Sequence, residues 1–187
     1  MSVTGLVLAA GEGRRLGTPK SVLEVGGRRL VDRAVDVLHE AGLADVVVVA
    51  GARSLDVPGA QVVDNPDWPS GMGSSLRSGL AALPAGTSAV VVMLVDTPGL
   101  GPAVVRRLVA AHDEGARVVV ATYDGAPRNP VLLAREHWAE VGRLAVGDGG
   151  ARAFLSAYPE LVTYVECGDV GDPSDLDTPE DLRRFEG

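Results

Sequence analysis

Short valine-rich runs alternate with segments of helical periodicity, and this alternation restricts the fold more than any other feature. The apolar runs cover residues 3–9, 46–50, 90–95, 118–122 and 161–166, with a shorter candidate at 61–63. Helical spacing covers residues 30–41, 74–83, 102–112 and 151–158, and a last helix is expected to begin at 178–179. Short runs rich in valine are typical of buried parallel strands. We therefore expect an α/β fold, a doubly wound and mostly parallel sheet with helices on both faces, which is a Rossmann-like arrangement.

The whole chain is expected to form one domain. No repeat, linker or low-complexity stretch divides its 187 residues, so we expect a single domain over 1–187. Hydrophobic residues make up 46% and aromatic residues 4%, so valine, alanine and leucine must fill the core. Residues 127–130, Pro-Arg-Asn-Pro, predict a loop, followed by a strand of different direction at 131–134.

Charge and composition restrict the partners. A net charge of −8 disfavours nucleic acid, because that binding draws on a basic surface. No apolar run has the length of a membrane span, and no secretory signal is evident. The single cysteine, Cys167, has no partner for an internal disulfide and is interpreted as a core residue. We therefore expect a cytoplasmic protein that binds neither nucleic acid nor membrane.

A glycine-rich loop at residues 8–20 ends in the only lysine of the chain, Lys20, whereas arginine occurs sixteen times. Lysine is a compact point charge, and glycines allow backbone amides to approach an anion closely, so the loop predicts a polyphosphate site. In the dinucleotide fingerprint the third glycine would come one residue earlier than Gly17. In a Walker loop the lysine would follow glycine, but here it follows Pro19.

Asp96 ends the apolar run 90–95, where a rigid strand can position a carboxylate for a metal ion. A second carboxylate is expected from Asp175 or Asp177, and the residues themselves do not decide between them. Two such carboxylates should repel one another when no metal is bound. The three histidines are spaced too irregularly to be metal ligands, and we interpret them as surface or filler residues.

Five motifs in order resemble those of one enzyme family. Residues 8–20 resemble the pattern L-A-A-G-x-G-x-R-(L/M)-G-x-x-K, and 96–98 resemble its D-x-P metal motif. Residues 65–80, 147–152 and 175–182 resemble the remaining motifs. The chain thus resembles nucleotidyltransferases of the molybdenum cofactor cytidylyltransferase (MocA/MobA-like) group over nearly its whole length. The resemblance implies that an acceptor phosphate attacks the α-phosphorus of a nucleoside triphosphate, releasing pyrophosphate.

The resemblance also implies roles for individual residues. Catalysis is expected from Arg15, Lys20 and Asp96. Nucleotide binding is expected from Leu8, Ala9, Ala10, Gly11, Gly13, Arg15, Lys20, Gly71, Met72, Ser74 and Ser75. Asp96 and Asp177 would hold Mg²⁺, with Mn²⁺ as the alternative. Acceptor binding is expected from Arg128, Asp148 and Arg152. The motif favours Arg15 as the phosphate contact over the adjacent Arg14.

The donor is expected to be CTP, because guanylyltransferases of this superfamily tend to have a second glycine where Ala10 stands. The resemblance implies molybdopterin as the acceptor and a molybdoenzyme as the protein that would receive the product. Residues 128–130, Arg-Asn-Pro, depart from the family's Gly-x-Pro or Gly-His-Pro, so a different acceptor phosphate stays open. The alternatives are guanylyl or other nucleotidyl transfer to a sugar or alditol phosphate, a non-catalytic cofactor-insertion chaperone, and a dehydrogenase.

Overall fold

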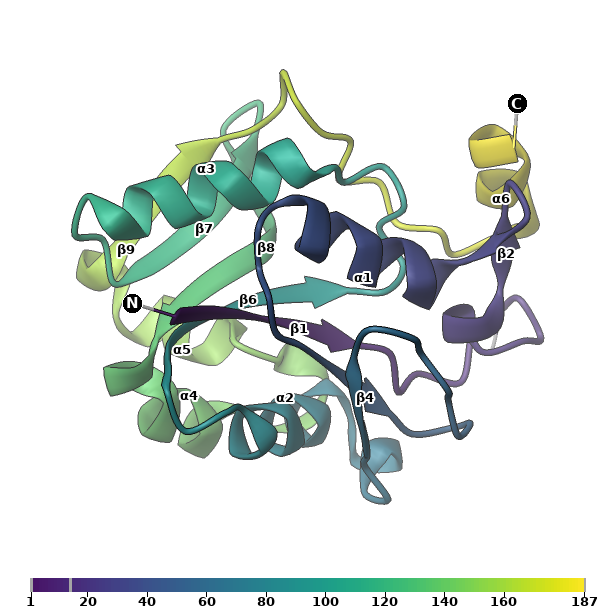
Figure 1. The fold of residues 1–187 in the computed structure, drawn as a ribbon, viewed down its shortest axis with the longest axis horizontal. Coiled ribbons are helices and arrows are strands. Elements are labelled where there is room, and N and C mark those ends of the chain that lie inside the picture. The colour runs from purple at the N-terminus through teal and green to yellow at the C-terminus, as the bar shows by residue number, and fades with distance from the viewer. Residues whose placement is uncertain (1, 14, 187) are drawn as a thin grey trace.

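The computed structural model describes residues 2–13 and 15–186, and a seven-stranded sheet forms its centre (Figure 1). The strand order is β5-β4-β1-β6-β8-β7-β9. Its members are β1 (Ser2–Leu8), β4 (Val46–Ala50), β5 (Gln61–Asp64), β6 (Thr87–Leu94), β7 (Val118–Tyr123), β8 (Ala126–Ala134) and β9 (Val162–Glu166). Only β8 runs antiparallel to its neighbours β6 and β7. The mostly parallel, doubly wound sheet expected from the alternation is therefore confirmed.

Helices cover both faces of this sheet. On one face lie α1 (Leu30–Glu40) and α3 (Pro102–Asp113), and on the other α2 (Met72–Ala82), α4 (Trp138–Leu144) and α5 (Arg152–Ala157) (Figure 1). The last helix, α6 (Pro179–Glu186), lies near the small hairpin of β2 (Glu24–Val25) and β3 (Arg28–Arg29). Short 3₁₀ turns are η1 (Lys20–Val22), η2 (Trp68–Ser70), η3 (Arg135–His137), η4 (Gly147–Gly149) and η5 (Pro159–Leu161). Among the described residues, no helix is long and apolar enough to span a membrane.

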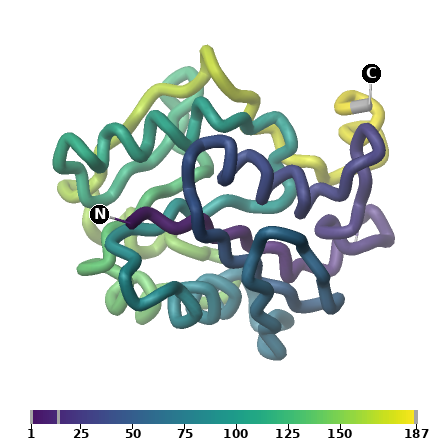
Figure 2. Tube along the Cα trace, viewed as in Figure 1, coloured from purple at the N-terminus to yellow at the C-terminus, as the bar shows by residue number. Residues whose placement is uncertain are grey.

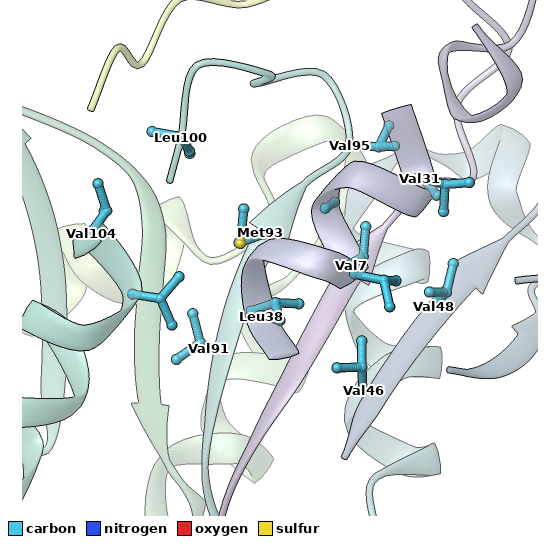
Figure 3. Close-up of a cluster of buried hydrophobic side chains, with 14 of the residues drawn as sticks. Val7, Val31, Leu38, Val46, Val48, Val91, Met93, Val95, Leu100 and Val104 are labelled. Atoms are coloured by element: carbon cyan, nitrogen blue, oxygen red, sulfur yellow. The ribbon is translucent and has the colours of Figure 1, made fainter. Parts of the chain in front are cut away.

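The hydrophobic core has two layers because successive strand residues point to opposite faces of the sheet. In β1, Val7 packs beneath α1 with Leu38, as Figure 3 shows, whereas Leu6 and Leu8 belong to the layer under α2. Leu38 is fully buried, which contributes about 1.5–3 kcal/mol relative to exposure. Valine and leucine side chains thus fill the core of a chain with few aromatic residues.

The antiparallel strand β8 confirms the change of direction expected at 131–134, but the loop expected at 127–130 was wrong. Residues 126–128 already pair with β7, since Ala126 lies opposite Tyr123 and Arg128 opposite Ala121. A tight turn at Asp124-Gly125, with φ of 51° and 78°, makes this hairpin possible. The two prolines suggested a break, although proline is tolerated where a strand pairing is irregular, as it is between Val120 and Ala121.

The C-terminal segment returns across the molecule to the carboxyl end of β6. Figure 2 shows these last residues beside an early part of the chain, near the hairpin that precedes α1. The Asp172 amide donates to Gly99 O at 3.1 Å and the Leu176 amide to Asp96 O at 2.8 Å. The Leu176 side chain is completely buried. Because neighbours in an extended segment point to opposite sides, anchoring Leu176 in the core turns Asp175 and Asp177 away from it.

Candidate active site

The glycine-rich loop and Asp96 leave the sheet at the same edge. Leu8 and Leu94 are partners in the parallel pair β1–β6, and the Val95 amide donates to Leu8 O at 3.3 Å. Ligands of doubly wound sheets bind outside the carboxyl ends of the strands. This edge is therefore where the fold is expected to bind a ligand.

Gly13 gives the loop its conformation. Its φ is 66°, and a Cβ atom there would lie 2.0 Å from the carbonyl oxygen of Thr18. The amides of Leu16 and Gly17 donate to Gly13 O at 2.9 and 3.0 Å, which closes the turn. Only glycine fits this position without displacing the backbone. Gly11, in contrast, has no atom of the described part of the chain within 4 Å of a Cβ added there.

A pocket of about 400 Å³ opens between the ends of β1 and β6 and the start of α2. Eight of the residues expected to bind nucleotide line it: Leu8, Ala10, Gly11, Gly13, Lys20, Gly71, Met72 and Ser75. The metal candidate Asp96 and the acceptor candidate Asp148 line it too. The sequence reasoning left out five further lining residues, Glu12, Trp68, Pro69, Leu94 and Val95. Trp68 stands within a quoted motif, so an aromatic residue there was an available signal.

Three expected nucleotide residues do not line this pocket. Ala9 is buried in the core layer beneath α1. Ser74 is buried, donates to the carbonyls of Asp67 and Gly71 at 2.9 and 2.8 Å, and accepts from Asn65 Nδ2 at 2.8 Å. Ser74 therefore holds the loop before α2 in shape. The Arg15 side chain is 78% exposed and lines a neighbouring hollow with Lys20 and Asp177.

The glycines at the start of α2 pack against another part of the protein. A Cβ on Gly71, whose φ is 112°, would lie 2.4 Å from the carbonyl carbon of Gly147. A Cβ on Gly73 would lie 2.5 Å from Ala145 O. Gly71, which lines the pocket, and Gly73 therefore also allow the start of α2 to touch the 145–148 turn, which carries Asp148 to the pocket.

At the mouth of the pocket, Lys20 joins the two candidate metal carboxylates. Its Nζ donates to Asp96 Oδ2 at 2.7 Å and also to Asp177 Oδ1. Arg15 Nη1 lies 3.6 Å from Asp177 Oδ2. Burial disfavours the charged lysine, but the charges of the two aspartates and their hydrogen bonds outweigh it and raise the pKa of Lys20. The structure therefore brings Arg15, Lys20, Asp96 and Asp177 together from distant parts of the sequence.

The carboxylates fit a divalent cation. Asp96 Oδ1 is buried and has no hydrogen-bond partner among residues 2–13 and 15–186, so it is an oxygen available to a metal. The described residues contain no group of three or more metal-ligating side chains. A pair of aspartates suits Mg²⁺, which usually takes one or two carboxylates together with phosphate oxygens and water.

Asp177 is free of the helix-capping role that competes with metal binding. The start of α6 is capped by Thr178 and Asp181, since Asp181 Oδ2 accepts from the Thr178 amide at 2.8 Å and the Asp181 amide donates to Thr178 Oγ1 at 3.2 Å. Asp175 also belongs to this group of acids. Although part of the residue is exposed, burial of its carboxyl group and then the charges of Asp96 and Asp177 raise its pKa.

The three acceptor candidates are dispersed. Asp148 lies in the pocket wall, and the exposed Arg128, on β8, is near enough to Asp175 for its charge to favour ionisation of that carboxyl group. Arg152 is exposed at the first position of α5 and does not line the pocket. Arg14, the alternative to Arg15, lies outside the described residues.

Known proteins are similar to this chain in sequence and in fold. Residues 5–162 match the model of the MobA-like NTP transferase domain. Nicotine blue oxidoreductase of Paenarthrobacter nicotinovorans is 38% identical over 98% of this chain and 96% of its own. Molybdenum cofactor guanylyltransferase of Rhodobacter capsulatus is 33% identical over 100% of this chain and 96% of its own.

A solved structure agrees. Rv0371c of Mycobacterium tuberculosis H37Rv superposes with a TM-score of 0.81 at 30% identity, covering 99% of this chain and 97% of that one. Another crystal structure of Rv0371c is a complex with manganese. The family model covers most of the chain, and the relatives exceed 30% identity over nearly all of it. This chain belongs to the MobA-like NTP transferase family and is a nucleotidyltransferase by fold and by sequence.

Proposed function

We propose that this chain transfers a nucleotidyl group, CMP from CTP in preference, to a phosphate-bearing small molecule of the molybdopterin class in the cytoplasm. One observation carries the proposal. The only lysine of the chain bonds both Asp96 and Asp177, and it lines a 400 Å³ pocket together with the glycine-rich loop. Such a site combines a cation, a carboxylate pair and open backbone, which together suit a metal-bound triphosphate.

The residues would act by alignment and charge stabilisation. An oxygen of the acceptor phosphate attacks the α-phosphorus, the bond to the β-phosphate oxygen breaks, and pyrophosphate leaves. The acceptor phosphate is already ionised, so the protein need not supply a nucleophile. Lys20 and Arg15 would neutralise the triphosphate, and the open backbone at Gly11 would face its oxygens. Asp96 and Asp177 would hold Mg²⁺ or Mn²⁺, which stabilises negative charge on phosphate oxygens when bound.

The choice of CTP rests on the floor of the pocket. Ala10 lines it, and a Cβ on Gly51 would lie only 2.7 Å from both Ala10 Cβ and Trp68 Cβ. Ala10 is buried and packs closely against Gly51, which leaves its methyl group little space to move away from a ligand. A purine needs more room than a pyrimidine at this point. Guanylyl transfer is the competing donor choice, which the name of the Rhodobacter capsulatus relative favours.

The acceptor would approach from the side of Asp175 and Arg128. Arg128 replaces the glycine expected in the motif before the 131–134 strand, and its charge acts on Asp175, a neighbour of the carboxylate pair. A guanidinium there suits a phosphate monoester. Asp148 would contact the nucleotide or acceptor from the opposite wall. Molybdopterin is the acceptor we favour, and sugar and alditol phosphates are the alternatives because they carry the same kind of phosphate group.

Pyrophosphate release tests the proposal. Each of the four nucleoside triphosphates is incubated with Mg²⁺ and with molybdopterin, a sugar phosphate or an alditol phosphate. We expect release that requires an acceptor and is fastest with CTP and molybdopterin. Faster release with GTP would overturn the donor assignment, and the absence of release in every combination would reject nucleotidyl transfer. Tight nucleotide binding without release would favour a chaperone that passes a finished cofactor to a molybdoenzyme.

Redox chemistry is a second candidate because a relative 38% identical over 98% of the chain is named an oxidoreductase. The same preparation should be tested for oxidation of NADH and NADPH with a dye as electron acceptor. We expect no turnover, since Gly17 comes one residue too late for the dinucleotide fingerprint. Dye reduction without pyrophosphate release would place this chain with that relative.

A further inference from the structure

Lys20 occupies the position that a divalent cation would need. Its Nζ is 2.7 Å from Asp96 Oδ2 and also bonds Asp177 Oδ1, so one ammonium group bridges both carboxylates. The Lys20 and Asp96 side chains are only 18% and 21% exposed, which limits screening by water. A cation that bonds the same two oxygens, Asp96 Oδ2 and Asp177 Oδ1, must lie where the ammonium group already is.

We propose that Lys20 and a divalent cation exclude one another on the Asp96–Asp177 pair, so that Lys20 serves as an internal counter-ion until a metal–nucleotide complex replaces it. The part concerning nucleotide rests on the proposed function. The exclusion itself rests only on geometry and charge. Mg²⁺ binds oxygen at about 2.0–2.1 Å, and a dication held by both carboxylates would repel an ammonium group still in contact with them.

Lys20 has somewhere to go. It lines the 400 Å³ pocket as well as the hollow of about 220 Å³ formed with Gly13, Arg15, Leu16 and Asp177. A four-carbon stem can turn its charge from the carboxylates toward phosphates in the pocket without movement of the backbone. Arginine, with its wide planar fork, could not make this exchange within the same space. The use of lysine here, in a chain with sixteen arginines, then has a physical reason.

The carboxylates need a counter-ion when no metal is present. Asp96 and Asp177 both accept a hydrogen bond from the one ammonium group of Lys20, so without it the two negative charges would repel one another. The sequence alone suggested a repelling pair in the metal-free protein, but the ammonium group of Lys20 offsets this repulsion. The metal-free protein is therefore stabilised by the same lysine that opposes metal entry. Nucleotide phosphates would relieve this opposition by attracting Lys20.

Metal titration without nucleotide tests the proposal by calorimetry, using Mn²⁺ with the wild type, Lys20→Met and Arg28→Met. Methionine keeps the length of the lysine stem and removes the charge. Arg28 is the matched control, because its Nη2 pairs with Asp36 Oδ2 at 2.5 Å at an exposed site on β3. We expect Lys20→Met to bind Mn²⁺ at least about 10-fold more tightly than the wild type, and Arg28→Met to bind it as the wild type does.

Further variants show where the metal binds and whether the fold survives. Adding Asp96→Asn to Lys20→Met should abolish the gain in Mn²⁺ affinity. If the double variant keeps that gain, Mn²⁺ does not bind at Asp96. In EDTA the melting temperature of Lys20→Met should fall below that of the wild type and recover with Mn²⁺. If Lys20→Met does not fold, Lys20→Gln provides the same comparison. Unchanged or weaker Mn²⁺ binding by a folded variant overturns the exclusion, whereas failure of pyrophosphate release would overturn the proposed function alone.

Discussion

Replacing Gly13 by alanine should impair nucleotidyl transfer far more than it impairs stability. The new Cβ would lie 2.0 Å from Thr18 O, and Cβ contacts shorter than 3.0 Å essentially never occur, so the loop must shift by about 1 Å. A misplacement of about 1 Å in a catalytic group can lower a rate by about 10²-fold. We therefore expect kcat/KM for pyrophosphate release to fall by about two orders of magnitude.

The stability cost should be much smaller. A left-handed non-glycine residue costs about 1–2 kcal/mol, and each kcal/mol lowers the melting temperature of a chain of this size by about 2–4 °C. Gly17→Ala is the matched control, because φ is 69° there but no atom of the described residues lies within 4 Å of the added Cβ. Calorimetry should show that Gly13→Ala loses somewhat more stability than Gly17→Ala, because its loop must also shift, but only Gly13→Ala should lose most of its activity. Equal activities in the two variants would refute the argument that the clash with Thr18 fixes the loop.

Three further changes test other parts of the structure. Leu176→Ala should lower the free energy of unfolding by about 2–5 kcal/mol and weaken Mn²⁺ binding, since this buried side chain positions Asp177, whereas Leu176→Met should largely preserve both in denaturant and metal titrations. Glu166 accepts hydrogen bonds from the Thr122 hydroxyl and from three backbone amides, which lower its pKa. The wild type should therefore be more stable than Glu166→Gln, fully so above about pH 5, and this difference in stability should disappear as the pH falls through the lowered pKa. Melting temperatures measured against pH test this, and a difference that grows in acid would contradict it. Gly71→Ala should separate α2 from the 145–148 turn and weaken nucleotide binding, measured by calorimetry, and wild-type affinity would show that this contact is dispensable.

Elements with a strong local pattern could be predicted from the sequence. The runs at 46–50 and 118–122 became β4 and β7 because valine-rich segments of this length can be buried on both faces. Helix α4 was missed because it has only seven residues, of which Val141 alone is buried, although Trp138 and Leu144 follow helical spacing and pack against the core. The pairing of 126–128 with β7 was missed because Pro127 and Pro130, which lie within β8, suggested a loop.

The sequence allowed most residues of the candidate site to be predicted, but not the contacts that they make with one another. Glycine spacing and the solitary Lys20 indicated an anion site, and Asp96 followed from its position at a strand end. Nothing local could reveal that Lys20 bonds the carboxylates themselves, because this contact joins residues 76 and 157 positions apart. The packing role of Gly73 was hidden for the same reason, since its neighbour, Ala145, is far along the chain.

The most direct test of the account is a crystal structure with CTP and Mn²⁺, in which the anomalous signal locates the cation. We predict a cation bound to carboxylate oxygens of both Asp96 and Asp177, near the distance of about 2.1 Å usual for Mg²⁺. Lys20 should have left that pair for the triphosphate, and the base should lie beside Ala10 and Trp68 in the 400 Å³ pocket. A cation more than about 4 Å from Asp96, or a nucleotide outside this pocket, would contradict the account.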